Sequence, residues 1–416
     1  MKKYFGIILV FCLMVLSTCS DITRNDSKND DPVAGVIYKI DEIPKKCIAA
    51  NNNFSMDLFK SVNTEDLDKN VFLSPVSASF SLGMTMNGSD GSTYEKMKNT
   101  LGFSDLSLEE INATYGALIQ ELYTVSDGVE FNLANSIWYS NLFSLQDEFR
   151  QLNENYFDAK VEGLDFGNAE NTLNTINSWV EDQTNDRIKD LIQELDPNAC
   201  MFLINAIYFK ADWKYQFDEE NTAESQFFTG SDETVVCDMM NIKSNFKYLQ
   251  ANDYDAVELP YGNENYAMLL VMPTAENVND FVKITNHSVI ADIVASLGED
   301  SVNVALPKME IEYEKELNDA LKSMGISEAF EPTANFSKMF NEMDGSIWIE
   351  KVKQKSFLKI NEEGTEAAAA TSTQMNYESV SDEVFLTFNR PFIFFIMEKR
   401  TNTILFCGKI MNPVEE

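Results

Sequence analysis

The spacing of hydrophobic residues changes from a helical to a strand-like period along the chain. In the first half, Phe54, Leu58, Phe59 and Val62 recur at the interval of an amphipathic helix. A second amphipathic helix is predicted over residues 173–192, whose apolar positions share one face. The first half of the chain is therefore expected to supply most of the helices.

Strand patterns follow and dominate the second half. The mostly apolar run 202–209, interrupted by Asn205, predicts a strand that is buried on both faces. Residues 302–306 alternate between apolar and other side chains, and the apolar runs 392–397 and 404–410 predict a hairpin. Helices that precede strands in this way favour an α+β fold with large sheets.

The N-terminal residues have the pattern of an export signal. Lys2 and Lys3 precede an apolar run that ends at Leu16, too short to span a bilayer comfortably. The following Ser17-Thr18-Cys19 resembles, together with Leu16, the lipobox of bacterial lipoproteins. Residues 1–18 are thus expected to be a signal peptide and Cys19 the lipidated residue. An ordinary secretory signal, with Cys19 incidental, is the alternative.

Residues 19–44 are predicted to be a flexible acidic tether, because they begin with a polar stretch without apolar periodicity. About 25 residues of flexible chain reach roughly 25–30 Å. The predicted location is the bacterial cell envelope, after export, with the lipid anchor as the one membrane contact. Display on the outer-membrane surface is one arrangement that this permits.

Charge and histidine content narrow the function. With 67 Asp and Glu against 32 Lys and Arg, the formal charge is −35. Such a polyanion is expected to repel nucleic acids and heparin-like polyanions. His287, the one histidine, lies in a polar stretch without a nucleophile motif, so neither a catalytic triad nor an imidazole-rich metal site is expected. We expect no cofactor, no metal, no catalytic residue and no enzyme activity.

Residues 361–383 do not fit any core element. The segment starts with charged residues, passes through Gly364 and four alanines, and ends in small polar residues. A loop of this length inside a compact domain is usually either functional or disordered. Composition alone leaves both interpretations open.

The motifs around this loop resemble the serpin family. Residues 362–371 resemble the reactive-loop hinge of inhibitory serpins, and residues 386–396 resemble the C-terminal signature of the family. Further ordered matches lie at 70–77, 176–181, 203–210, 257–261, 306–308 and 406–410. The resemblance implies one serpin domain over 45–416, with three β-sheets, about nine helices and an exposed reactive-centre loop at about 362–383.

The resemblance also implies a mechanism. A target protease attacks the loop, and the cleaved loop then enters the main sheet as a new strand. Alternate residues from Thr365 to Thr373 would face inward, namely Thr365, Ala367, Ala369, Thr371 and Thr373, and all five are small and uncharged. Gly364 is expected at the turn into the sheet because glycine has a wide φ range. The expected hinge residues are Glu362, Gly364, Thr365, Ala367, Ala368, Ala369, Ala370 and Thr371. Before cleavage, the alanine run could instead form a short helix.

A polar cluster, the shutter, is expected beneath the point where the sheet opens. By resemblance it consists of Ser74, Ser77, Asn205 and Gln354, the last at a position that is often histidine in relatives. Glutamine also donates and accepts hydrogen bonds, so function should survive this departure. Ordinary helix capping by Ser74 and Ser77 is the simpler interpretation, and it is compatible with the shutter role.

The resemblance to inhibitory serpins also implies where the loop is cleaved. In such relatives the attacked residue usually lies fourteen positions after the hinge glycine, which from Gly364 gives Glu378 and a cleaved bond between Glu378 and Ser379. Counting back from the C-terminal signature allows Tyr377 to Val380. The predicted function is a monomeric inhibitor of serine proteases, with cysteine proteases as further targets. The alternative is a non-inhibitory binding or structural module on the cell envelope.

Overall fold

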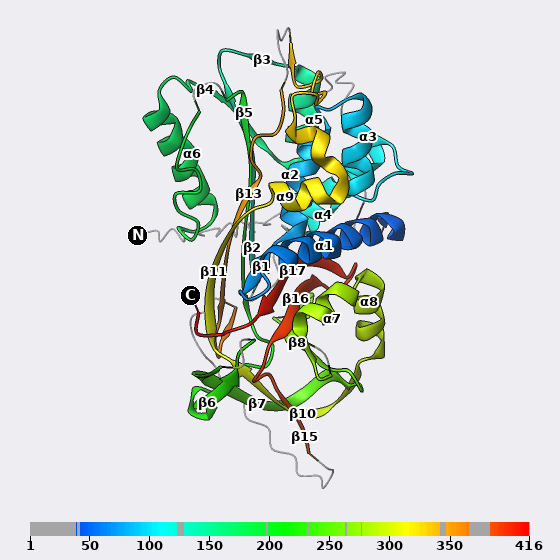
Figure 1. Cartoon of the computed structure of the whole chain (residues 1–416), viewed down its shortest axis with the longest axis vertical. Helices are drawn as coiled ribbons and strands as arrows, with labels where there is room; N and C mark the ends of the chain where they lie inside the picture. The colour runs from blue at the N-terminus through cyan, green and yellow to red at the C-terminus, as the bar shows by residue number, and fades with distance from the viewer. Residues whose placement is uncertain are drawn as a thin grey trace, which may run out of the picture. The chain divides into compact units, whose positions relative to one another are not determined.

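The computed structural model describes residues 39, 42–122, 129–196, 199–230, 233–262, 264–275, 277–341, 347–365 and 383–415 (Figure 1). The predicted signal peptide, Cys19 and most of the tether lie outside these residues. So do the hinge residues Ala367, Ala368, Ala369, Ala370 and Thr371, and the predicted cleavage window from Tyr377 to Val380, including Glu378 and Ser379. Those predictions stay predictions. No helix among the described residues is long and apolar enough to cross a membrane.

Most helices lie in the first half of the chain, as the periodicity predicts. The described residues form nine α-helices: α1 (Lys45–Glu65), α2 (Pro75–Met86), α3 (Gly91–Thr100), α4 (Leu108–Leu122), α5 (Asp147–Phe157), α6 (Ala169–Gln183), α7 (Val278–Ile284), α8 (His287–Ser296) and α9 (Asn318–Leu321). The apolar stripe that begins at Phe54 is buried along α1. Pro75 begins α2, a position where its missing N–H costs nothing.

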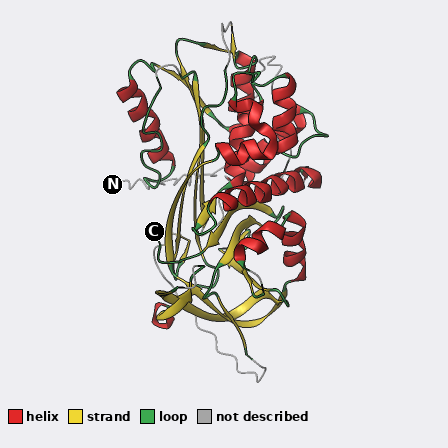
Figure 2. Ribbon diagram, viewed as in Figure 1, coloured by secondary structure: helices red, strands yellow, loops and turns green. Residues whose placement is uncertain are grey.

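The main sheet has six strands in the order β11-β13-β14-β5-β2-β4. Their bounds are β11 (Met309–Glu316), β13 (Lys353–Ile360), β14 (Gly364–Thr365), β5 (Met201–Asp212), β2 (Val129–Ser140) and β4 (Lys160–Leu164). The predicted strand at 202–209 is β5, and it pairs antiparallel with β2 over most of its length. Figures 1 and 2 show α6 on one face of this sheet and α2 and α4 on the other.

A second sheet of nine strands follows the order β1-β17-β16-β9-β8-β7-β10-β15, with β6 paired to β7. It comprises β1 (Val71–Leu73), β6 (Ala223–Phe228), β7 (Thr234–Gln250), β8 (Tyr254–Tyr261), β9 (Tyr266–Pro273), β10 (Gly298–Pro307), β15 (Val384–Thr387), β16 (Phe392–Glu398) and β17 (Thr403–Ile410). The predicted C-terminal hairpin is the antiparallel pair β16–β17. A third sheet pairs β3 (Ser144–Leu145) with β12 (Phe340–Asn341). The predicted α+β fold with three sheets is confirmed.

The prediction of one helix over residues 173–192 is wrong at its C-terminal end. Helix α6 stops at Gln183, and Asn185 and Asp186 then adopt left-handed backbone angles, with φ of 50° and 62°. The apolar period continues past the helix because Ile188 and Leu191 pack into the same cluster as the helix, although their backbone is not helical. Periodicity thus detected the burial but not the end of the helix.

Candidate functional site

The start of the hinge is held by a buried ion pair. The Glu362 side chain is almost completely buried, and its carboxylate accepts hydrogen bonds from Lys308 Nζ at 2.9 Å and from Thr222 Oγ1 at 2.8 Å. Burial alone would raise the pKa of this carboxyl, but the bonds that Lys308 and Thr222 donate outweigh it and lower the pKa. Glu362 is therefore ionised at neutral pH and ties the hinge to the residue after β10.

A tight turn follows Glu362 and brings the chain back toward the sheet. Asn361 N–H donates to the Gly364 carbonyl at 3.0 Å, and Asn361 Oδ1 accepts from Gly364 N–H at 3.0 Å. Trp213 holds the same turn, because its indole Nε1 donates to the Asn361 carbonyl at 3.0 Å and its backbone N–H donates to the Glu363 carbonyl at 2.8 Å. Hydrogen bonds that involve both the backbone and the side chains of Asn361 and Trp213 thus fix the start of the hinge.

Gly364 is needed here for space, which corrects the expected reason. The backbone of Gly364 is not in the positive-φ region. A Cβ atom at this position would lie 2.1 Å from the Ala211 carbonyl oxygen and 2.7 Å from Asp212 Cα. No side chain fits at such distances, so glycine allows the hinge backbone to approach β5 closely.

Two hinge residues already form a strand of the main sheet. In β14, Thr365 pairs with Ala211 of β5 on one side and with Ile360 of β13 on the other. Thr365 is buried, and its hydroxyl shares a 2.7 Å hydrogen bond with the hydroxyl of Tyr261, which stacks on Trp213. The hinge therefore begins as a central strand between β5 and β13.

β14 lies between β5 and β13, and we call the boundary between these two strands the seam. Within the part of the chain that the structure describes, strand pairing connects β5 to β2 and β14, and β13 to β11 and β14. No ladder among these residues joins β5 directly to β13. The seam is the place where a further central strand could be added.

Gln354 and Ser74 are brought together on the β13 side of the seam. The Gln354 side-chain amide accepts from Ser74 N–H at 3.1 Å and donates to the Ser74 carbonyl at 2.8 Å. The Ser74 hydroxyl donates to the Leu405 carbonyl at 2.9 Å. Because this hydroxyl makes no capping bond to α2, the capping interpretation is wrong for Ser74. The amide at position 354 satisfies both backbone groups of one residue.

Ser77 and Asn205 meet on the β5 side of the seam. The Ser77 hydroxyl donates to Asn205 Oδ1, and Asn205 Nδ2 donates to Asn135 Oδ1 on β2. Asn135 Nδ2 in turn donates to the Phe157 carbonyl at 2.7 Å. Since Ser74 and Ser77 both belong to the start of α2, this helix end is bonded to both strands of the seam.

Several residues of this arrangement were not predicted to have a role. Lys308 occurs in the motif 306–308 and Trp213 follows the motif 203–210, but nothing in the sequence pairs Lys308 with Glu362. Asn135 lies in none of these motifs. Tyr261 lies in the motif 257–261 but was given no role, because the contacts of both residues depend on cross-strand register between segments far apart in the chain. His287 lies elsewhere, as the first residue of α8, where it is half-buried and burial lowers its pKa.

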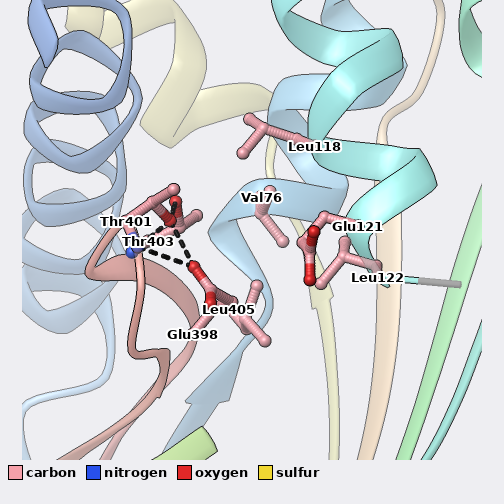
Figure 3. A pocket seen from close by; sticks show the side chains of 8 residues that line it. All are labelled: Val76, Leu118, Glu121, Leu122, Glu398, Thr401, Thr403 and Leu405. Atoms are coloured by element: carbon pink, nitrogen blue, oxygen red, sulfur yellow. Dashed lines mark hydrogen bonds between the residues drawn. The ribbon is translucent and has the colours of Figure 1, made fainter. Parts of the chain in front are cut away.

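A small cavity lies beside the shutter between α2, α4 and the β16–β17 hairpin (Figure 3). Its volume of about 10 Å³ is close to that of one water molecule, so it is too small for an organic ligand. Two buried carboxylates, Glu121 and Glu398, line it, and the Arg400 guanidinium forms ion pairs with both. Glu398 also accepts from Thr401 N–H at 2.8 Å, which fixes the hairpin turn. The cavity is structural.

Comparison with known proteins identifies this architecture. The family model described as "Serpin (serine protease inhibitor)" matches residues 49–413. The chain belongs to the serpin family, most of whose members inhibit proteases rather than act as enzymes.

The relatives span almost the whole chain. Human serpin B11 is 31% identical over 388 residues, which cover 88% of this chain and 98% of that protein. Chicken (Gallus gallus) neuroserpin is 32% identical over 370 residues, which cover 86% of this chain and 90% of that protein.

Solved structures also match most of this chain in fold. The thermophilic serpin tengpin in its native state matches with a TM-score of 0.84 and 30% identity, covering 91% of this chain and 97% of that one. Thyroxine-binding globulin in complex with thyroxine matches with a TM-score of 0.80 and 29% identity, covering 89% and 100%.

Proposed function

We propose that this serpin inhibits serine-type endopeptidases as a suicide substrate. The protease's serine Oγ attacks the carbonyl carbon of the reactive bond, the C–N bond breaks, and the amine of the following residue leaves with a proton. The acyl ester stays intact because the freed loop enters the seam and carries the protease with it. A cysteine protease would form the corresponding thioester.

The observation that carries this proposal is the register of β14. Thr365 lies opposite Ala211 on β5 and opposite Ile360 on β13, and both pairings are antiparallel, so each later residue of the hinge would face an earlier residue of each neighbouring strand. If the strand grows in this register, Thr371 reaches the position opposite both Asn205 and Gln354. The two halves of the shutter would then flank one inserted threonine.

The same register matches residue size to the available space. Ala367 would lie between Phe209 and Leu358, and Ala369 between Ile207 and Ser356. All four of these neighbours are buried, with 1–8% of their surface exposed. Small uncharged side chains can enter such a layer, whereas a bulky or charged residue could not without a large cost. This is the composition expected of a strand that has to be inserted.

Beyond the hinge, we propose Glu378–Ser379 as the reactive bond, within the window 377–380. Because β5 begins at Met201, an inserted strand in this register would have partners on β5 as far as Met375, three residues before Glu378. We also propose that the protein is an exported monomer tethered to the cell envelope through Cys19. Its net charge of −35 disfavours activation by heparin-like polyanions.

A non-inhibitory binding module is the second candidate. It has one specific point in its favour, since a solved structure of similar fold is thyroxine-binding globulin with thyroxine bound. That function would not require small residues at the inward hinge positions. The match between hinge residues and seam therefore favours inhibition.

The test is to mix the intact protein with a panel of serine and cysteine proteases and to analyse the products under denaturing conditions. Inhibition predicts a covalent complex whose mass equals protease plus serpin minus the released C-terminal fragment. Cleaved serpin without any complex, across the whole panel, would contradict the proposal and favour the second candidate.

A further inference from the structure

The segment after α6 is held in an unusual backbone conformation on the outer face of the main sheet. Asn185, Asp186 and Asp190 all have left-handed backbone angles, with φ between 50° and 62°. Asn and Asp tolerate this region better than other non-glycine residues, yet such a conformation persists only where the surroundings hold it. Asn177 supplies part of that support, because its side chain donates to the Ile192 carbonyl at 2.8 Å and accepts from Ile192 N–H at 3.0 Å.

This segment is attached to the β2–β5 side of the seam. Ile188 and Leu191 are buried, with 2% and 7% of their surface exposed. They belong to a small hydrophobic cluster that also contains Trp138 of β2 and Ile204 of β5. Asn185 adds a hydrogen bond from its side-chain amide to Glu130 of β2. The segment must therefore move together with β5 whenever the seam opens.

Arg187 reaches from this segment to the other side of the seam. Its guanidinium Cζ lies 5.6 Å from the centroid of the Phe357 ring. Phe357 is half-buried on β13, on the face opposite to the buried Ser356 and Leu358. A cation within about 6 Å of a ring centroid is attracted to the ring face. The Arg187–Phe357 contact therefore connects the segment that is packed on β2 and β5 to β13. A new central strand would have to separate β5 from β13.

We infer that Arg187 is a latch that opposes opening of the seam and so sets how fast a strand can enter it. The inference rests on the proposed function, because it concerns the same insertion step. One added strand moves its neighbours apart by about 4.8 Å, which would roughly double the distance between guanidinium and ring and break the contact. An exposed contact of this kind corresponds to about a two- to five-fold change in rate.

The experiment measures uptake of a synthetic strand, which needs no protease. A fluorescein-labelled peptide with the sequence of residues 365–375 is incubated with intact protein, and its incorporation is followed over time on native gels. Arg187→Gln should take up the peptide about two- to five-fold faster than the unmodified protein, and Arg187→Lys should stay close to it. Phe357→Leu should match Arg187→Gln, and the double variant should be no faster than either.

Arg150→Gln is the matched control. Arg150 lies 5.7 Å from the Tyr139 ring, a similar contact in which both residues, on α5 and β2, lie on one side of the seam. Its loss should leave the uptake rate unchanged. An Arg187→Gln variant that takes up the peptide at the unmodified rate or more slowly, or one whose increase is shared by Arg150→Gln, would overturn the latch. Faster uptake in a protein that traps no protease would instead sink the proposed function and leave the latch standing.

Discussion

A single negative charge at an inward hinge position should convert the inhibitor into a substrate. Ala369→Glu is the sharpest form of this change, because the register of β14 would place position 369 between Ile207 and Ser356 if the inserted strand continues it. Both neighbours are buried, with 8% and 4% of their surface exposed. The new carboxyl group would have to enter the layer that these buried side chains line.

The size of the effect follows from the protonation cost. A glutamate in such a layer would enter in its neutral form, and neutralising a carboxyl of ordinary pKa ~4.3 at pH 7 costs about 4 kcal/mol. If the transition state of insertion carries this whole cost, insertion slows about a thousand-fold at pH 7. At pH 5 the same cost falls to about 1 kcal/mol, so acid should restore much of the trapping.

The assay is the ratio of covalent complex to cleaved serpin, measured at pH 7 and pH 5 with a protease that the unmodified protein traps. Ala370→Glu is the matched control, because the same continued register would place the neighbouring position on the outer face beside Lys355, whose ammonium pairs with Glu312 and could also meet the new charge. Ala369→Glu should give almost only cleaved serpin at pH 7, whereas Ala370→Glu should still form the complex. If Ala369→Glu trapped the protease as well as Ala370→Glu does at pH 7, the proposed register of insertion would be refuted.

Two further changes test the shutter and the core. Gln354→His should make the free energy of unfolding depend on pH, because a neutral imidazole can accept a hydrogen bond from Ser74 N–H and an imidazolium cannot. The pKa of the introduced imidazole in the folded protein should therefore lie below the ordinary value of ~6.5. The variant should then lose stability as the pH falls from that ordinary value through the folded pKa. Thermal unfolding between pH 5 and 8 would show this slope in the variant alone. Burial lowers the pKa of Lys409 to about 8, although its ammonium donates to two carbonyl oxygens and to Asn279. The unfolded chain then binds more protons between pH 8 and ~10.4, so stability should rise with pH there, and urea titrations should show that Lys409→Met lacks this rise.

Much of the fold and part of the site followed from the sequence. Periodicity located α1, β5 and the C-terminal hairpin, and the resemblance singled out Ser74 and Gln354, which lie 280 positions apart and are hydrogen-bonded. Short-range patterns could not show that Gly364 is needed for its close approach to β5, because that depends on how two distant strands pair. They also missed the end of α6 at Gln183, because the buried side chains continue where the helical backbone does not.

The central claim is that cleavage of the reactive loop traps the protease covalently. The most direct measurement is mass spectrometry of the denatured product formed with a trapped protease, including the fragment that is released. The account predicts a covalent complex and a fragment of residues 379–416, with ends shifted at most within the window 377–380. Free protease with a fully cleaved serpin, or a complex whose released fragment begins outside that window, would contradict it.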